Sequence, residues 1–554
     1  MIVLGANLGA TADGHEVHDG GACLLADGVV LGGVAEERLT RRKHCGGYEN
    51  AGRFLLRTSG YAVSDVDLLV LSCYGEEPRL DLFSEIPLAD VRRVEMIPSH
   101  HLSHAYSAFL PSGFTKALIL VADNEGGIIG KRRYPELWKN ALERVSVYIG
   151  QGATVELLER DMDQDDVVSL GELYGNVTRF LGFQTYLNAG KTMALAAMGD
   201  PERFSDVPLI ELLPGGRIGC PLRNEYLNSS AEIRRYFANY GHDLPLERDP
   251  NCPIASVHMD LAAAVQRQLE EALLHKVRYW VGITGVRHLC LAGGVALNCV
   301  ANQRLLREVP LDGIFVQPNA GDQGQGLGNA LYGWHHILER QEPICIPGVY
   351  LGGEYSDDLC LAALASRASE VTWRVCADVS RQTAEAIARG AVVGWFQGRS
   401  EWGPRALGNR SILADPRNSE MKDRVNRSVK HRESFRPFAP AVPIEYANTY
   451  FDLRQSMNHM TVSANAWPSA ISRIPAVIHI DGSARVQTVA AGDNMLFHRL
   501  LLDFGELTGI PVLLNTSFND NDEPIVETPA DAINCFLRSQ MDILVMNEII
   551  VVKT

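Results

Sequence analysis

Two histidines and a nearby aspartate have the spacing of a metal site in this sequence. His100 and His104 are four residues apart, so on a helix both imidazoles lie on one face while His101 points elsewhere. The apolar run Ala117–Val121 predicts a buried strand, and Asp123 lies just beyond its end, where active sites of open α/β sheets form. Two imidazoles one turn apart can bind one cation. The alternative is a pair of solvated polar residues at a helix start.

A second carboxylate favours the metal interpretation. Asp322 follows another predicted strand, Gly313–Val316, and the glycines on both sides of it allow close approach of the backbone to a ligand. Two histidines and two aspartates suit an open-coordination transition metal such as iron, zinc or manganese.

A candidate general base lies in the polar loop that contains His15, His18 and Asp19. This loop connects the first two of three predicted strands, over Ile2–Ala6, Ala22–Ala26 and Val29–Ala35. His18 could take a proton while Asp19 orients its ring. The alternative is a solvated loop histidine.

The strand pattern repeats later in the first lobe. A second set of three strands is predicted over Ala117–Ala122, Val145–Ile149 and Thr154–Glu159, which indicates two related halves. Residues 36–44 alternate in charge, and we expect them to be solvated or salt-bridged. Residues 200–256 are polar and irregular, as in a lid or an acceptor-recognition insertion.

Two glycine segments could bind phosphate. Gly190-Lys191-Thr192 is similar to a phosphate loop but lacks the full spacing. The strand that begins at His288 runs into Gly293-Gly294 and then a helix, a junction whose backbone amides favour phosphate. Tight packing is an equal alternative for these two glycines.

A linker is predicted at residues 342–348, and an α/β unit follows it. Between Arg399 and Arg436 ten cationic residues accompany five acidic ones. Several of the cations lie among aromatic and proline residues, so an anionic ligand such as a polyphosphate or acyl phosphate would offset their desolvation. We assign anion binding to Lys430, Arg436 and Arg405. We expect a solvated helix face for Arg424 and Arg427.

Two later segments carry further candidates for anion binding. Arg485 opens a predicted strand, and Asn515 and Ser517 end another. The two short polar side chains could hydrogen-bond a carbamate or a phosphate. Turn capping is their alternative role.

The bulk composition excludes some function classes. The 554 residues are 46% hydrophobic and 21% charged, as in a globular enzyme of several domain-sized units. The net charge of −16 disfavours nucleic acid and anionic membranes as partners. Eleven cysteines without a Cys-x-x-Cys pair fit free thiols, and no signal peptide or spanning segment is recognised. We therefore expect a cytoplasmic protein.

Ten short motifs occur in order along nearly the whole chain: His18-Asp19, Glu36-Glu37-Arg38, His100–His104, Asp123, Gly190–Met193, Gly293–Asn298, Gly321-Asp322, Gly403–Gly408, Arg436–Pro440 and Leu514–Asn519. Together they resemble the O-carbamoyltransferase family of antibiotic and nodulation-factor tailoring. The resemblance implies a two-lobed α/β protein. Residues 1–343 would form a Kae-like domain of the actin/sugar-kinase/Hsp70 fold, and residues 350–554 a YrdC-like domain.

The resemblance also implies an activity. ATP, with Mg²⁺ as its companion, and carbamoyl phosphate would yield carbamoyl-adenylate in the C-terminal domain. The carbamoyl group would then pass to a hydroxyl of a small-molecule natural product, beside Fe²⁺ or another divalent metal in the N-terminal domain.

Carried over residue by residue, the resemblance assigns roles to the candidates. The metal ligands would be His100, His104, Asp123 and Asp322, and His18 would be the base. The residues that hold the carbamoyl and phosphate groups would be Lys430, Arg436, Arg485 and Ser517. Further cofactor contacts would come from Lys191, Gly293, Gly294, Asn298, Arg405 and Asn515.

Other interpretations remain open. The chain could be a small-molecule kinase of the actin/sugar-kinase type, a hydrogenase-maturation or tRNA-threonylcarbamoyl type of transferase, or a nucleotide-dependent binding protein. The absence of paired-cysteine zinc motifs in the sequence argues against the hydrogenase-maturation type, and the acidic charge against a tRNA partner. The acceptor is expected to be chosen by residues 130–142 and 200–256. A homodimer is the default expectation.

Overall fold

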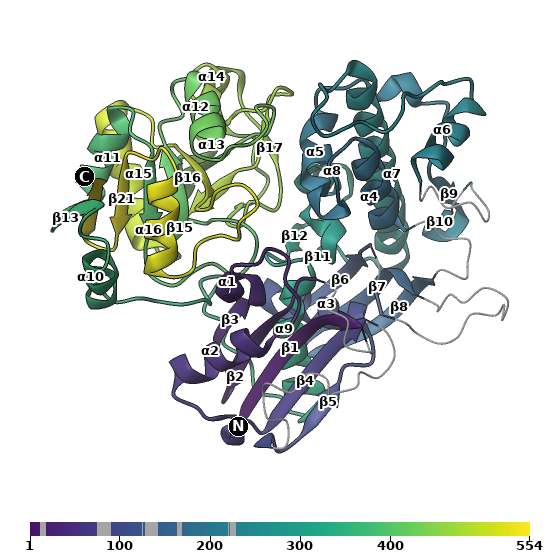
Figure 1. The fold of residues 1–554 in the computed structure, drawn as a ribbon. Helices are drawn as coiled ribbons and strands as arrows, with labels where there is room; N and C mark the ends of the chain where they lie inside the picture. The colour runs from purple at the N-terminus through teal and green to yellow at the C-terminus, as the bar shows by residue number, and fades with distance from the viewer. Residues whose placement is uncertain are drawn as a thin grey trace.

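The computed structural model describes residues 1–11, 18–74, 90–124, 126–127, 142–162, 169–219, 221 and 229–554. The N-terminal lobe begins with a five-stranded sheet at the bottom of Figure 1, in the order β3-β2-β1-β4-β5. The strands are β1 (Ile2–Thr11), β2 (Gly21–Ala26), β3 (Val29–Ala35), β4 (Leu68–Tyr74) and β5 (Val94–Met96). Strands β1, β2 and β3 pair antiparallel, whereas β4 and β5 continue parallel to β1. A two-residue turn joins β2 and β3, with positive φ at both Asp27 and Gly28.

The second half of this lobe repeats the arrangement. Its sheet has the order β8-β7-β6-β11-β12, made of β6 (Lys116–Ala122), β7 (Glu143–Gln151), β8 (Thr154–Met162), β11 (His288–Ala292) and β12 (Gly313–Val316). Here too the first three strands are antiparallel and the last two continue parallel to the first. The predicted duplication is confirmed, and this repeated sheet identifies the N-terminal lobe as one of the actin/sugar-kinase/Hsp70 fold.

Helices fill the space between these sheets and cover their outer faces. Helices α3 (His100–Phe109) and α9 (Gln325–Tyr332) lie between the two sheets (Figure 1). They approach closely because α9 carries glycine where a Cβ at Gly328 would lie 1.9 Å from the carbonyl oxygen of Ser103. The outer helices are α1 (Glu36–Thr40), α2 (Glu49–Ser59), α4 (Leu170–Phe180), α5 (Ala189–Ala196), α6 (Ser230–Ala238), α7 (Ser256–Thr284) and α8 (Cys299–Glu308). A small hairpin is formed by β9 (Glu211–Leu213) and β10 (Arg217–Gly219).

The C-terminal lobe is a distinct α/β domain on one mixed eight-stranded sheet, ordered β13-β22-β21-β14-β15-β20-β16-β19. The strands are β13 (Val371–Val375), β14 (Val393–Phe396), β15 (Arg410–Ala414), β16 (Ala439–Pro443), β19 (Gln487–Val489), β20 (Leu513–Ser517), β21 (Ile543–Met546) and β22 (Ile549–Lys553). One face is covered by α11 (Val379–Ala388) and α15 (Met495–Thr508), whose apolar side chains pack on the strands. The remaining elements are α10 (Asp357–Ala365), α12 (Glu420–Ser428), α13 (Ala447–Tyr450), α14 (Pro468–Ile471), α16 (Pro529–Arg538), β17 (Ala464–Asn465) and β18 (Ser483–Ala484).

The two lobes are held together by buried polar contacts from α1. Arg38 donates to the carbonyl oxygen of Gly403 at 2.7 Å, and Arg41 donates to those of Pro524 and Ile525 at 2.8 and 2.7 Å. The sequence predicts that residues 36–44 are solvated or salt-bridged, but Glu36, Glu37 and Arg38 are buried. Within the N-terminal lobe, Glu36 accepts from the amides of Asn50 and Ala51 and Glu37 accepts from the amide of His44, whereas Arg38 bonds across the lobe interface.

No helix in the described part of the chain combines the length and the apolar character that a bilayer-spanning segment needs.

Candidate active site

The two histidines and two aspartates singled out in the sequence converge on one buried point. His100 Nε2 lies 3.1 Å from Asp322 Oδ1, and His104 Nε2 lies 3.2 Å from both that oxygen and His100 Nε2. Asp123 Oδ2 completes the group at 3.4 Å from His104 Nε2 and 3.9 Å from His100 Nε2. We call these four residues the His/Asp cage.

The cage has the dimensions of a metal site. Bonds of about 2.1 Å to one cation place neighbouring ligand atoms roughly 3.0–3.4 Å apart in tetrahedral or octahedral geometry. One ligand atom from each of the four residues lies within 4.8 Å of the others. Asp123 Oδ2 is buried and makes no hydrogen bond with any residue that the structure describes. Two imidazoles and two carboxylates in contact therefore fit a divalent transition metal, and His100, His104, Asp123 and Asp322 could hold it.

The cage is assembled by the starts of two helices and the end of one strand. Ser99 caps α3, since its hydroxyl accepts from the amide of Leu102 and donates to the buried carboxylate of Glu143. His101 turns away from the cage, as expected, and its Nδ1 lies 2.7 Å from the hydroxyl of Ser146 on β7. Asp123 follows β6 directly, and Asp322 precedes α9. The two imidazoles are therefore on one helix, α3, which packs between the two sheets.

His18 lies beside the cage, as a base for a hydroxyl group would. Its Nδ1 is 3.2 Å from Asp19 Oδ2 and 3.9 Å from Asp322 Oδ2. Burial lowers the pKa of His18, but the hydrogen bond with Asp19 and the charges of Asp322 and Asp123 outweigh it and raise the pKa to about 9. Burial raises the pKa of Asp322 to about 7. A cation held by Asp123 and Asp322 would offset their charges and so lower the pKa of His18 toward the range in which a neutral imidazole can accept a proton. His15 lies outside the described residues.

Asn7, which the sequence did not single out, joins these two loops. Its amide donates to the carbonyl oxygens of Asp19 and Asp322, both at 3.1 Å. Asn7 is fully buried on β1. No motif marks it, because a single asparagine within a strand carries no sequence signal of its own.

A second group of side chains is cationic and belongs to the C-terminal lobe. Arg405 and Arg485 find no hydrogen-bond or ion-pair partner in the described part of the chain, although the Nε of each is buried. Burial and the neighbouring charge of Arg485 lower the pKa of Arg405 below its usual range. Burial also lowers the pKa of Arg436, and the nearby charge of Glu433 offsets this only in part. We call this group, with Lys430, the arginine chamber.

Lys430 is a buried residue of the arginine chamber. Its ammonium is buried and donates to Ser517, at 2.8 Å to the carbonyl and 3.2 Å to the hydroxyl oxygen. It also donates to Asn519, at 2.7 Å to the carbonyl and 2.6 Å to the side-chain oxygen. Asn515 is held differently, since its amide donates to Ala406 and Gln487. Lys430 therefore orders the strand end that carries the predicted hydroxyl ligand.

The loop that presents Arg405 is folded around a buried carboxylate. Glu401 Oε1 accepts from the backbone amides of Leu407 and Asn409 at 2.8 Å and of Arg410 at 3.0 Å. Sequence reasoning passed over Glu401 because it counted the acid only as one partner in the charge balance. The signal was available in the run Gly403–Gly408, whose backbone amides need an acceptor.

One cavity of about 480 Å³ joins the two groups. Its lining includes His18, Asp123 and Asp322 from one lobe and the cationic side chains of the arginine chamber from the other. Of the other predicted contacts, the lining includes Lys191, Gly294, Asn298, Asn515 and Ser517. Gly293 is not in the lining. It packs instead, since a Cβ there would lie 2.3 Å from the carbonyl oxygen of Ala122.

Two of the predicted contacts are already engaged by the protein. Asn298 caps α8 and exchanges hydrogen bonds with the amide of Gln266. Lys191 is on α5 and forms an ion pair of 2.9 Å with Glu433 of the other lobe.

The cationic segment between Arg399 and Arg436 divides into structural and chamber residues. Arg399 and Arg410 donate to backbone carbonyl oxygens, and Arg410 stacks on Phe396 with its guanidinium 3.7 Å from the ring centre. These two need no anionic ligand, and the prediction of anion binding did not include them. Arg424 and Arg427 are exposed, as expected.

The predicted lid does not reach the cavity in the described part of the chain. Residues 200–219 and 229–256 pack near α7, and none of them is in the cavity lining. Residues 128–141 lie outside the described residues, so the predicted acceptor role of 130–142 has no structural counterpart here.

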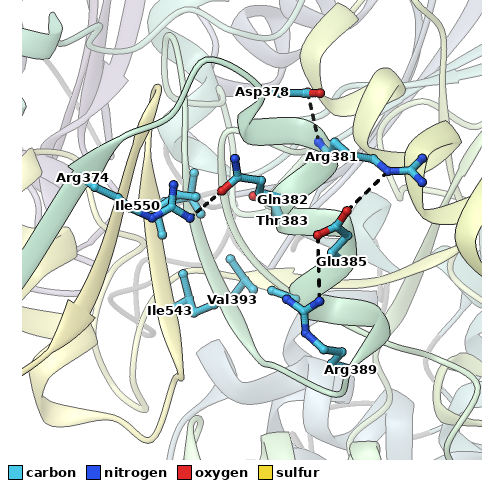
Figure 2. A pocket seen from close by; sticks show the side chains of 12 residues that line it. Arg374, Asp378, Arg381, Gln382, Thr383, Glu385, Arg389, Val393, Ile543 and Ile550 are labelled. Atoms are coloured by element: carbon cyan, nitrogen blue, oxygen red, sulfur yellow. Dashed lines mark hydrogen bonds and ion pairs between the residues drawn. The ribbon is translucent and has the colours of Figure 1, made fainter.

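A second hollow, of about 540 Å³, lies on the C-terminal lobe between α11 and the sheet. Figure 2 shows its charged side chains directed at one another. Glu385 forms ion pairs with Arg381 and Arg389. Asp378 forms an ion pair with Arg499 and also accepts from the backbone amide of Arg381. The charged side chains of this second hollow are paired with one another or with neighbouring residues. In this the hollow differs from the cavity between the lobes, where Arg405 and Arg485 have no partner among the described residues.

Comparison with known proteins agrees with this division. A family model described as "Carbamoyltransferase N-terminus" matches residues 13–81 and 84–331, and one described as "Carbamoyltransferase C-terminus" matches residues 384–553. The chain is 37% identical to nodulation protein NolNO of Sinorhizobium fredii (strain NBRC 101917 / NGR234), over 97% of this chain and 79% of that protein. It is 32% identical to 3'-hydroxymethylcephem-O-carbamoyltransferase of Streptomyces clavuligerus, over 65% of this chain and 64% of that protein.

Among solved structures, full-length HypF in its phosphate- and nucleotide-bound form matches with 11% identity and a TM-score of 0.34. The match covers 61% of this chain and 56% of that one. A likeness of this size adds nothing to what the strand order shows.

Proposed function

The chain belongs to the carbamoyltransferase family, and we propose that it is an ATP-dependent O-carbamoyltransferase that makes carbamoyl-adenylate in one lobe and uses it in the other. The observation that carries the proposal is one cavity that is lined both by the arginine chamber and by Asp123 and Asp322 of the His/Asp cage. A carbamoyl-adenylate would be hydrolysed if it were released. Passage within one cavity would protect it from water.

The arginine chamber, within residues 350–554, would form the adenylate. ATP and carbamoyl phosphate are polyanions, and the chamber offers the guanidinium groups of Arg405 and Arg485, which have no partner among the residues that the structure describes. Bidentate contacts from Arg405, Arg436 and Arg485 would offset both their own desolvation and their mutual repulsion. Lys430 and Ser517 would hold the carbamoyl end, and Mg²⁺ would accompany ATP. Hydrolysis of carbamoyl phosphate would first release phosphate and leave carbamate. The carbamate oxygen would then attack the α-phosphorus of ATP, and pyrophosphate would leave.

The His/Asp cage, within residues 1–343, would carry out the transfer. His18 takes the proton of the acceptor hydroxyl, whose oxygen then attacks the carbamoyl carbon while AMP leaves. When bound, a divalent metal such as Fe²⁺ supplies a Lewis acid that polarises the carbamoyl carbonyl. Asp322 also has a second role, because its Oδ2 lies near Nδ1 of His18 and favours the imidazolium that forms.

The acceptor is proposed to be a small-molecule alcohol. One relative is named for acting on 3'-hydroxymethylcephem, a primary alcohol. The cavity of about 480 Å³ is within the range of small-molecule pockets. Its side toward His18 is lined by Tyr186, Asn188 and Tyr174, which can contact an acceptor through both rings and polar groups.

The experiment separates the two half-reactions. The protein is incubated with ATP and labelled carbamoyl phosphate, and the pyrophosphate and carbamoyl-adenylate that form are measured. A panel of alcohols that begins with 3'-hydroxymethylcephem is then added to measure transfer. Arg436→Ala should stop adenylate formation. His104→Ala should leave it intact and stop transfer. The exposed Arg427→Ala is the matched control and should retain both.

Two results would overturn the proposal. Equal loss of both half-reactions in Arg436→Ala and His104→Ala would refute the division between lobes. Phosphorylation of an alcohol by ATP without pyrophosphate release would instead favour a small-molecule kinase, the alternative that the fold of the first lobe allows.

A further inference from the structure

A second histidine lies on the far side of Asp19 from His18. His44 Nδ1 is 2.9 Å from Asp19 Oδ1, while His18 Nδ1 is 3.2 Å from Asp19 Oδ2. The two imidazoles therefore contact different oxygens of one carboxylate. His44 follows α1, in a stretch of the sequence that carried no candidate.

Asp19 is held in place by three donors. Besides the two imidazoles, the side-chain amide of Gln323 donates to Asp19 Oδ1 at 2.9 Å. Burial raises the pKa of this carboxyl, yet the hydrogen bonds from His18 and His44 hold it well below its usual value. An ionised carboxylate with donors on both oxygens cannot rotate without losing one of them. Its orientation, and so that of His18, is determined by its neighbours.

Backbone hydrogen bonds also link the segments that contain Asp19 and His44. The amide of Asp19 donates to the carbonyl oxygen of His44 at 3.3 Å, and the amide of His44 donates to Glu37 Oε2 at 2.8 Å. Asp19 has a positive φ of 59°, a conformation that costs a non-glycine residue free energy and persists only where the surroundings impose it. His44 supplies part of that constraint through both its main chain and its ring.

We propose that His44 is a positioning residue for carbamoyl transfer, acting through Asp19 to fix the imidazole of His18 toward the acceptor. The inference rests on the proposed function, because it takes His18 to be the base. In this arrangement Asp19 accepts from Nδ1 of His18, so Nε2 is the nitrogen that takes the hydroxyl proton. His44 is also in the cavity lining, so a direct contact with the acceptor would show as a raised acceptor KM, whereas positioning through Asp19 lowers kcat at unchanged KM.

A metal bound by Asp19, Glu37 and His44 is the competing interpretation, since one ligand atom from each lies within 4.8 Å of the others. The hydrogen bonds oppose it. Asp19 Oδ1 already accepts from Gln323 and faces Nδ1 of His44, and Glu37 Oε2 already accepts from the amide of His44. A cation would have to displace these donors.

The test compares His44→Leu with His44→Asn. The asparagine amide can place a donor near the position of Nδ1, whereas leucine keeps bulk and removes the donor. In His44→Leu we expect kcat for transfer, to the panel alcohol that gives product, to fall about 10- to 100-fold, as for other residues that orient a reacting group. The acceptor KM, pyrophosphate release and metal content should be unchanged. His44→Asn should restore most of kcat.

Several results would overturn the inference. Unchanged kcat in His44→Leu, or equal loss in both variants, would exclude a positioning role. Loss of one metal equivalent would favour the metal interpretation. Crystal structures of both variants provide a readout that needs no activity: the Nδ1–Oδ2 contact of His18 with Asp19 should break in His44→Leu and persist in His44→Asn. An inactive wild-type protein would refute the proposed function, and the crystal structures would still decide the positioning.

Discussion

Replacing Glu401 by alanine should impair or abolish adenylate formation, although this carboxylate acts through the backbone of the loop that presents Arg405. Its Oε1 accepts three backbone amides, and the carboxylate is buried. An amide left buried without a partner costs about 1–3 kcal/mol, so holding the loop unchanged would cost about 3 kcal/mol or more. The loop between β14 and β15 should rearrange to avoid that cost. Arg405, which this loop presents, would then leave the chamber.

The assay is pyrophosphate release at varied ATP and carbamoyl phosphate, beside urea unfolding. Glu401→Ala should raise both KM values or lose activity, and should lower the urea midpoint. Glu401→Gln retains one acceptor oxygen and should lie between this variant and the wild type. Glu420→Ala removes an exposed carboxylate in the first turn of α12 and should change neither quantity. Wild-type kinetics in Glu401→Ala would refute the view that this carboxylate positions Arg405.

Three further outcomes are expected. His100→Ala should lose most bound metal, as measured by elemental analysis, while its circular dichroism stays that of the wild type; retained metal would place the ion elsewhere. Lys191→Glu should slow transfer by breaking the 2.9 Å ion pair with Glu433, and Lys191→Glu combined with Glu433→Lys should recover it; no recovery would contradict a specific pairing. Burial lowers the pKa of His459 to about 4, so the unfolded chain binds the extra proton first and stability should fall as pH drops from about 6.5 to about 4. His459→Gln should flatten that fall in urea midpoints, and an equal slope would assign it to other groups.

The strands and the His/Asp cage were predictable from sequence for a common physical reason. Buried parallel and central strands need continuous apolar runs, and such runs were visible over residues 117–121 and 313–316. Side chains that follow such strands gather at one edge of a sheet, so Asp123 and Asp322 could be placed near each other. The helical spacing of His100 and His104 then completed the group.

Contacts that depend on tertiary folding were not predictable in the same way. The charged residues of α1 alternate as in a solvated helix, yet Arg38 reaches the carbonyl oxygen of Gly403 in the other lobe. Arg410 has the same residue type as the chamber arginines, and only the fold shows that backbone carbonyls surround it. Local sequence records charge and apolar character. It does not record which distant carbonyl will lie within reach.

The proposed base lies in a loop of the first sheet, whereas the cage takes Asp123 from the end of a strand in the second sheet and His100, His104 and Asp322 from the starts of the helices between the sheets, so the separation of base and cage depends on how these parts pack. Asn7 on β1 bonds the backbones of Asp19 and Asp322, and Asn329 on α9 donates to the carbonyl of Ala6 at 2.7 Å. The helix that follows Asp322 is thereby tied to the strand that precedes His18. An amide is suited to this place because the two oxygens that it contacts are both carbonyls, and only a donor can bridge them without repulsion. Proton transfer needs the base within about 3 Å of the hydroxyl, so a shift between the halves would separate base from cage before either unfolded. The distance between His18 and the His/Asp cage is therefore set by the buried side chains of Asn7 and Asn329, which take no part in the proposed chemistry.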